Sequence, residues 1–303
     1  MAVDIGGSHV TAGLVELARA GRLPPARVVR MAADECWSAP RLLDAWASTA
    51  SLAAAKAPQG MHIDAVGLAV PAPFDYVNGV SRMEHKFAAL HSVRVAEALR
   101  ARWVGDPRFD AVAIRFGNDG DLWTLGEACF GAGIGARKVI GITIGTGLGS
   151  GFVADGVVVR SGVGVPPDSE LWSTPFNGAT AEDAASGRSL GDSYARRLLG
   201  GTRRGAADET EPVPGEEIAR RARHGDSNAQ DAFTEMGRSL GRVLRPWAIS
   251  FEADVVVVGG SIAHAWNLFA APLAEQLSGV RVVRTQLFEE ATLRGAAELC
   301  CPS

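Results

Sequence analysis

Lysine and long apolar runs are the first things that this sequence lacks. Only Lys56, Lys86 and Lys138 are lysines, so arginine supplies 27 of the 30 basic residues. With so many alanines, this bias is typical of GC-rich coding and indicates no arginine-based function. No window reaches the roughly 18 apolar residues of a membrane-spanning helix, and the N-terminus has an acid and two glycines where a signal peptide has a basic and then an apolar region. We therefore expect a cytoplasmic protein without a membrane partner.

Cysteine is scarce as well, and two common nucleotide motifs are missing. Cys36, Cys129, Cys300 and Cys301 form no CxxC pair, which leaves no obvious disulfide framework and fits a reducing compartment. No glycine is followed directly by lysine, so the Walker A loop is absent. Residues 131–136 (GAGIGA) match a loose dinucleotide pattern, but they follow a helical stretch and precede a strand. That order is the reverse of the Rossmann motif, which disfavours a dehydrogenase.

The charge balance is close to neutral. The chain has 34 acidic and 30 basic residues, a net charge of -4 at pH 7, and 47% hydrophobic residues. This composition is that of a globular protein, and its net charge gives no global attraction to nucleic acid or to an anionic membrane. At roughly 150 residues per domain, a length of 303 residues predicts two domains.

Short apolar runs rich in β-branched residues alternate with longer helical patterns. We predict strands over residues 63–70, 112–116, 139–144, 151–153 and 255–258. We predict helices over residues 40–56, 93–103, 122–130, 216–224 and 228–247, with a kink or an end near Pro246. Residues 200–217 are polar and rich in Gly and Pro, which predicts a surface excursion. The alternation indicates an α/β fold.

Three glycine-bearing segments lie at predicted strand ends, where bare backbone N–H groups can approach an anion. Residues 4–15 join two apolar runs through Gly6-Gly7-Ser8, which predicts a hairpin with Asp4 at its mouth. Residues 145–151 (GTGLGSG) predict a second hairpin after the strand at 139–144. Gly259-Gly260 ends a run of four valines and precedes a predicted helix. Each segment alone is explained by a tight turn, but the three together favour phosphate binding.

A candidate base follows the predicted strand at 112–116. Asn118 and Asp119 stand there, before a helix that contains Leu125-Gly126-Glu127. Asp119 is therefore expected at the carboxyl end of a strand, where the sites of α/β proteins gather, and its carboxylate can accept a proton. An Asn-Asp pair before a helix is equally typical of a helix N-cap. Local spacing does not decide between the two interpretations.

Four motifs occur in a fixed order: DxGG near the N-terminus, NDxxxxxLGE, GTGxGxG and a late VVVxGG strand. Together they resemble the ROK family of sugar kinases, within the actin/hexokinase ATPase superfamily, from Asp4 to about Leu299. The resemblance implies a two-lobed α/β fold, actin-like and ribonuclease H-like, with a cleft between the lobes. It places a small lobe at residues 1–116, a large lobe at 117–290, and a C-terminal helix at about 291–301 that packs back on the small lobe. Homodimers are usual in the family.

The resemblance also implies phosphoryl transfer from ATP, with Mg²⁺ held mainly by the nucleotide, to the 6-hydroxyl of a hexose. It makes Asp119 the base that accepts the hydroxyl proton and Asn118 a ligand of the sugar. Such a transfer requires positioning and charge neutralisation more than covalent help. The residues that the resemblance places around the phosphates, the nearby Mg²⁺ and the adenosine are Asp4, Gly6, Gly7, Ser8, Gly145, Thr146, Gly147, Gly149, Gly259 and Gly260.

Two segments of the family pattern are not intact here. Family members usually carry GExGH and then CxCGxxGCxE, whose His and three Cys bind a structural zinc. The corresponding positions hold Glu170 and, in place of the histidine, Ser173; no cysteine follows in residues 174–181, and Glu182 matches the second sugar-facing glutamate. Because zinc requires soft or imidazole ligands, we predict no zinc. We predict that apolar contacts of Trp172 and Phe176 order this loop instead.

Other departures also lie around the expected sugar. Ala72 replaces a glycine that touches the sugar, Ser8 and His9 replace Thr and Lys, and Asp121 replaces the second Asn of NDAN. The loss of an imidazole and the gain of a carboxylate make the region more acidic, and unpaired carboxylates favour a cationic sugar. We therefore predict an amino-hexose substrate, with kanosamine (3-amino-3-deoxyglucose) of antibiotic pathways as the named candidate and glucose as the alternative.

His85 and Lys86 lie in a segment that the family places near the sugar, and we interpret both as structural support. Less favoured functions are an N-acylmannosamine kinase, a sugar sensor that would have lost Asp119 or a glycine hairpin, and a ROK transcriptional repressor. A repressor carries a helix-turn-helix ahead of the sugar-binding lobes, and only three residues precede Asp4. We therefore expect no nucleic acid as a partner.

Overall fold

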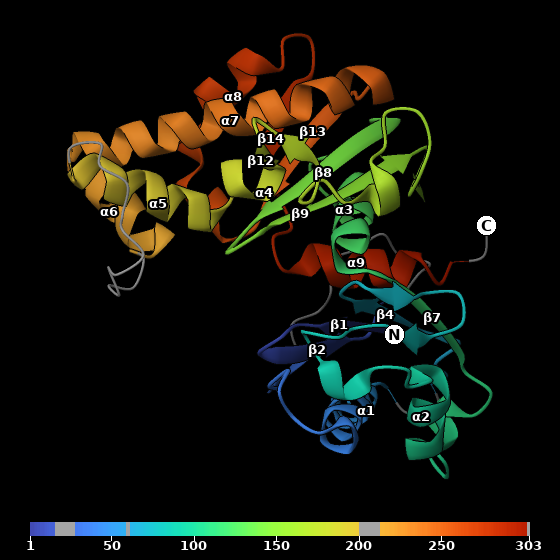
Figure 1. The fold of residues 1–303 in the computed structure, drawn as a ribbon. Coiled ribbons are helices and arrows are strands. Elements are labelled where there is room, and N and C mark those ends of the chain that lie inside the picture. The colour runs from blue at the N-terminus through green and yellow to red at the C-terminus, as the bar shows by residue number, and fades with distance from the viewer. Residues whose placement is uncertain (16–27, 59–60, 200–212, 302–303) are drawn as a thin grey trace. The chain divides into compact units, whose positions relative to one another are not determined.

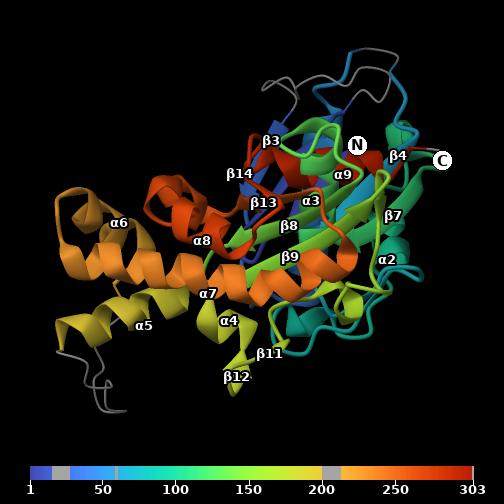
Figure 2. The same cartoon turned by 90° about the horizontal axis from the view of Figure 1, so that it is seen from above.

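The computed structural model describes residues 1–15, 28–58, 61–199 and 213–301. The chain forms two compact units, the first made of Met1–Phe130 with Glu289–Ser303 and the second of Gly131–Phe288. Each unit contains one five-stranded sheet covered by helices (Figures 1 and 2). Every strand and helix that the sequence predicts is present, within a few residues of its predicted bounds.

The sheet of the first unit has the order β3-β2-β1-β4-β7. Its strands are β1 (Ala2–Ile5), β2 (His9–Gly13), β3 (Val28–Ala32), β4 (Ala65–Val70) and β7 (Ala113–Asn118). Strands β1, β2 and β3 are antiparallel neighbours, whereas β4 and β7 run parallel to β1. The carboxyl ends of β1, β4 and β7 therefore meet at one edge of the sheet. A small hairpin of β5 (Phe74–Asp75) and β6 (Val80–Ser81) follows β4.

Helices cover both faces of this sheet. Helices α1 (Ala39–Ala54) and α2 (Val95–Arg102) lie on one face, and α9 (Glu290–Glu298) and α3 (Asp119–Phe130) lie on the other (Figure 1). Glycines allow the backbones to approach closely, since a Cβ at Gly126 of α3 would lie 1.9 Å from the carbonyl oxygen of Ala291 and one at Gly295 of α9 would lie 1.8 Å from that of Leu122. By these contacts α3 groups with the first unit, which extends to Phe130, and the lobe boundary at residue 116 stays a prediction.

The sheet of the second unit has the order β10-β9-β8-β13-β14. Its strands are β8 (Lys138–Ile144), β9 (Leu148–Ala154), β10 (Val157–Val158), β13 (Val255–Gly259) and β14 (Arg281–Arg284). Strands β8, β9 and β10 are antiparallel, and β13 and β14 run parallel to β8. All five residues of β13 are buried, which explains why its four valines form an unbroken apolar run rather than an alternating one.

The longest helix of the second unit, α7 (Ser227–Phe251), runs along α5 and α8 (Figures 1 and 2). The remaining elements are β11 (Pro175–Phe176), β12 (Ala179–Thr180), α4 (Ala181–Ala184), α5 (Gly187–Leu198), α6 (Gly215–Arg223) and α8 (Ala270–Gln276). Of the kink or end predicted near Pro246, the end is wrong, because α7 continues to Phe251. Ala248 and Phe251 are buried beyond the proline, and their packing offsets the hydrogen bond that proline cannot donate.

Two other predictions meet the structure only in part. Most of the predicted surface excursion at 200–217 lies outside the described residues, and α6 already begins at Gly215. The helix predicted after Gly260 is a 3-10 helix over Ser261–Leu268. Among the described residues, no helix combines the length and the apolar character needed to cross a bilayer.

Candidate functional site

The first glycine segment forms the predicted hairpin between β1 and β2. Ile5 pairs with Val10, and the Gly6 N–H donates to the carbonyl of His9 at 2.9 Å. A Cβ at Gly7 would lie 2.5 Å from Oε2 of Glu35, so a side chain here would displace that carboxylate. Within the described part of the chain, the N–H groups of Gly7 and Ser8 donate no hydrogen bond. The turn thus presents backbone donors that an anion can accept.

The second glycine segment forms the predicted hairpin between β8 and β9, where Ile144 pairs with Leu148. Its tip is fixed by Glu182, whose Oε2 accepts a 2.9 Å hydrogen bond from the Leu148 N–H and would lie 2.5 Å from a Cβ at Gly147. The hairpin also meets the start of α5, since the Gly187 N–H donates to the Gly145 carbonyl at 2.9 Å. A Cβ at Gly149 would lie 2.3 Å from Oγ1 of Thr143, which explains the third glycine of the motif.

The third glycine segment meets the second hairpin. Gly260 has a φ of +79°, and a Cβ there would lie 2.4 Å from the carbonyl oxygen of Ile144, so only glycine fits. The residues that follow line a cavity of about 690 Å³ in the second unit. Its lining includes Gly145, Thr146, Arg188, Arg223, Ser261 and Ile262. Gly259 and Gly260, which precede Ser261 in the chain, are not part of its lining.

Asn118 and Asp119 lie at the end of β7 and the start of α3. Oδ1 of Asn118 accepts hydrogen bonds from the N–H groups of Gly120 (2.9 Å) and Asp121 (3.2 Å), so Asn118 caps the helix. Its Nδ2 donates to the hydroxyl of Tyr76 at 3.3 Å, and that hydroxyl donates to the carbonyl of Val70. Asn118 therefore makes most of the cap, and Oδ1 of Asp119 accepts a hydrogen bond from the Gly120 N–H at 3.0 Å.

Two carboxylates of the first unit influence each other. Burial raises the pKa of Asp119, against the opposing charge of Lys86. Burial and the charge of Asp119 raise the pKa of Asp4 to about 7, while Arg30 and Lys86 oppose the shift. The structure therefore brings together the predicted base and the predicted acid of the first hairpin. Asp4 therefore exchanges its proton close to neutral pH, and a carboxyl of that kind suits acid–base chemistry.

The other predicted sugar ligands lie apart from this pair in the chain and fall in different units. Ala72 is half-buried in the first unit, between β4 and β5. Glu170 and Ser173 belong to the second unit, where Oε2 of Glu170 accepts a 2.9 Å hydrogen bond from Nε1 of Trp172 and Ser173 is exposed. The predicted apolar role holds for Phe176, which packs against the core, but not for Trp172, which is 44% exposed. The polar indole N–H gives Trp172 a carboxylate partner in place of a core contact.

The hydrogen bonds that order the loop around residues 169–173 were not predicted from the sequence. Oγ of Ser150 on β9 accepts from the Leu171 N–H at 2.9 Å and donates to the Ser169 carbonyl, and Leu171 is fully buried. Across the described residues, no group of three or more His, Cys, Asp or Glu side chains is placed to hold a metal ion. Tyr76 in the first unit and Ser150 in the second are thus hydrogen-bonding residues that the motifs did not indicate.

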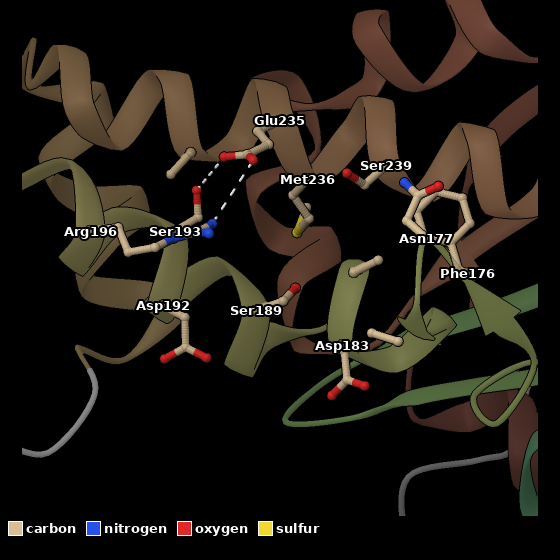
Figure 3. Close-up of a pocket in the computed structure, with 13 residues that line it drawn as sticks. Phe176, Asn177, Asp183, Ser189, Asp192, Ser193, Arg196, Glu235, Met236 and Ser239 are labelled. Atoms are coloured by element: carbon tan, nitrogen blue, oxygen red, sulfur yellow. Dashed lines mark hydrogen bonds and ion pairs between the residues drawn. The ribbon is translucent and has the colours of Figure 1, made fainter. Parts of the chain in front are cut away.

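A second cavity of about 630 Å³ lies between α5, α7 and the β11–β12 hairpin (Figure 3). Glu235 of α7 accepts from Oγ of Ser193 on α5 at 2.5 Å, and Arg196 lies 3.9 Å from the same carboxylate. Phe176 and Met236 supply apolar surface. None of the residues predicted for catalysis, sugar or nucleotide lines this cavity, and its central charges are paired with each other, so it is a site separate from the one built above.

The chain is similar to known sugar kinases over nearly its whole length. The ROK family matches residues 1–301. The glucokinase of Streptomyces coelicolor is 30% identical over 329 residues, which cover 98% of this chain and 96% of that protein. A solved ROK family glucokinase from Streptomyces griseus, in complex with glucose and AMPPNP, is 26% identical with a TM-score of 0.73 and covers 98% of this chain and 97% of that one. The DNA-binding transcriptional repressor Mlc of Escherichia coli is 22% identical over 78% of this chain and 60% of that protein.

These likenesses confirm the predicted fold class, because the structural neighbours are sugar kinases with the actin-like ATPase fold. The family match spans nearly the whole chain and includes all four motifs with which the resemblance began. This protein therefore belongs to the ROK family.

Proposed function

We propose that this protein transfers the γ-phosphoryl group of ATP to the 6-hydroxyl of glucose. The observation that carries the proposal is at the start of α3. Asn118 caps the helix there and leaves the Asp119 carboxylate available as an acceptor. The full-length likeness to glucokinases, one of them in complex with glucose and AMPPNP, supports the substrate pair.

In the proposed reaction the Asp119 carboxylate accepts the proton of the sugar 6-hydroxyl. The oxygen of that hydroxyl forms a bond to the γ-phosphorus, while the bond from phosphorus to the bridging oxygen breaks and its electron pair leaves with ADP. A positioned base contributes about 10²- to 10⁴-fold to such a step. The remainder comes from orientation and from neutralising the charge on the phosphoryl oxygens.

For the nucleotide we propose the cavity beside the second hairpin. Arg188 and Arg223 line it together with the hydroxyl-bearing Thr146 and Ser261, a set that can meet the charge and the hydroxyl groups of a nucleotide. The bare turns Gly6-Gly7-Ser8 and Gly145-Thr146-Gly147, with Gly149, are the proposed phosphate contacts. Mg²⁺ bound with ATP offsets phosphate charge, and Asp4 is the acid of the first hairpin that would lie nearest to it.

For the sugar we propose Asn118, Glu170, Ser173, Glu182 and Ala72 as ligands. The case for a cationic amino-hexose such as kanosamine depends on unpaired carboxylates. Glu170 already accepts from Trp172, and Glu182 accepts from the Leu148 N–H and lies 3.8 Å from Arg188. Because both carboxylates have partners, a cationic sugar gains little from them, and neutral glucose is the favoured substrate.

A sugar sensor of the repressor type is the second candidate, because the repressor Mlc is also a relative. Both glycine hairpins and Asp119 are present here, and the Asp119 carboxylate shares only the Gly120 N–H with the cap that Asn118 makes. A protein that only binds sugar requires none of these three features, so we favour catalysis.

The test is ADP formation with glucose, kanosamine, glucosamine, mannose and N-acetylmannosamine, compared as kcat/KM. We expect glucose to give the highest value. Asp119→Asn should lower kcat by at least about 10²-fold, the low end for a general base, with glucose binding retained. Asp110→Asn is the matched control, since Asp110 is an exposed acid of the same unit. Turnover unchanged in Asp119→Asn would remove Asp119 from the mechanism, and a higher value with kanosamine would reverse the choice of sugar.

A further inference from the structure

Lys86 lies against the first glycine turn. Its Cε would be 3.2 Å from a Cβ at Gly7, so the lysine stem covers this turn directly. The neighbouring Phe87 fixes the segment, because it is fully buried, has a φ of +52°, and packs edge-on against Trp46 with ring centroids 5.8 Å apart. A buried aromatic ring thus holds the exposed lysine in place beside the turn.

The charges around Lys86 are mainly negative. Asp4 and Asp119 both feel its positive charge, and Glu35 approaches Gly7 as well. The other nearby cation, Arg30, lies 2.9 Å from Glu289 and is paired with it. His9 adds no charge at pH 7, because burial and Arg30 lower its pKa, and residues 4–13 contain no Lys or Arg.

Lys86 differs from the other two lysines in its partners. Nζ of Lys56 donates to the carbonyl of Val28 at 3.0 Å, and Nζ of Lys138 lies 2.6 Å from Glu252. Among the residues that the structure describes, no carboxylate lies within 4.0 Å of Nζ of Lys86. Its ammonium group is therefore held at the turn without being neutralised by a contact.

We infer that Lys86 is a catalytic residue whose ammonium group contacts an oxygen of the transferred phosphoryl group at the Gly6-Gly7 turn. The inference rests on the proposed function. In the transfer the proton of the sugar hydroxyl goes to Asp119, the bond from the sugar oxygen to phosphorus forms, and the bond to the ADP oxygen breaks. Lys86 forms and breaks no bond. It supplies a preorganised positive charge that the bare hairpin lacks, and such groups act most strongly where charge develops in the transition state.

Three variants test this role: Lys86→Met, Lys86→Arg and the control Lys56→Met. We expect Lys86→Met to lower kcat by about 10²- to 10³-fold, the usual effect of removing one charge-stabilising group, with glucose affinity unchanged. Lys86→Arg keeps a cation and should recover part of the loss, and Lys56→Met should match the wild type. The acid limb of the kcat–pH profile should move to higher pH in Lys86→Met, since Asp119 loses a stabilising positive charge.

Melting temperatures of the variants separate folding from catalysis, and the arginine variant preserves the aliphatic stem that packs at Gly7. A structural role alone would lower the melting temperature and leave the acid limb where it is, which would overturn the inference. The inference would also be overturned if the wild type is active and the Lys86→Met variant has the same kcat. A wild type inactive with every sugar would overturn the proposed function itself, and that result is distinct because it precedes any comparison of variants.

Discussion

Replacing Asp4 by asparagine should make the folded protein more stable at alkaline pH and no more stable at acid pH. Burial and the charge of Asp119 raise the pKa of Asp4 from 3.8 to about 7. The folded protein therefore binds this proton more tightly than the unfolded chain does. The stability that the protonated carboxyl contributes is complete below about pH 4 and is lost as the pH rises through about 7. Asparagine, which stays neutral, escapes that loss.

The size of the effect follows from the shift. A difference of about three pKa units at 1.36 kcal/mol per unit gives an upper limit of about 4 kcal/mol above pH 7. Between pH 4 and pH 7 the gap in the free energy of unfolding between Asp4→Asn and wild type should grow by up to about 1.4 kcal/mol per pH unit. Solvent access or a small backbone movement that relieves the buried charge brings the effect below this limit.

Urea unfolding at pH 4.5 to 8.5 measures the gap. The protein should be free of nucleotide and divalent metal, because a cation bound at Asp4 would stabilise its charged form. Asp110→Asn, an exposed acid of the same unit, is the control and should follow the wild type at every pH. Repeating the pair in an Asp119→Asn background removes the charge that helps to raise the Asp4 pKa, so the gap should narrow. A gap of equal size at pH 5 and pH 8 would refute the reasoning.

Two further predictions concern the second unit. Glu182→Ala removes the acceptor of the Leu148 N–H and should loosen the second hairpin, so we expect the KM for ATP to rise several-fold. Glu182→Gln keeps an acceptor oxygen and should raise this KM less. Equal KM values for ATP in both variants would contradict this role of Glu182. Elemental analysis of the purified protein should find no stoichiometric zinc, because Ser173 and residues 174–181 supply no imidazole or thiolate, and one zinc per chain would overturn that account.

Elements whose signal is local could be predicted from the sequence. The β1–β2 and β8–β9 hairpins follow from glycines between two apolar runs, and β13 follows from four successive valines. The extent of α7 could not be predicted, because a proline in a helical pattern is typical of a helix end or a kink. What keeps the helix going beyond Pro246 is the burial of Ala248 and Phe251, and that depends on the rest of the core.

The motifs in the sequence indicate candidate site residues, but they do not predict the tertiary contacts of those residues. Local sequence left Asp119 divided between a helix cap and a base, and only the hydrogen bonds of Asn118 to Gly120 and Asp121 show which residue takes the cap. Lys86 approaches Gly7 from a segment far away in the chain. No spacing rule connects the two positions, because the buried ring of Phe87 sets where the lysine lies.

The contacts that charged side chains make in the fold, rather than their number in the sequence, decide which ligand charge the protein favours. Counting acids in the sequence favours a cationic sugar, but a bound ligand meets only the charge that the protein leaves unpaired. Glu170 and Glu182 are partnered by Trp172, by the Leu148 N–H and by Arg188, whereas no carboxylate in the described part of the chain contacts the Lys86 ammonium. Beside the first glycine turn Lys86 therefore supplies a cation, which suits a phosphoryl group, and the departures from the family pattern do not by themselves select an amino sugar.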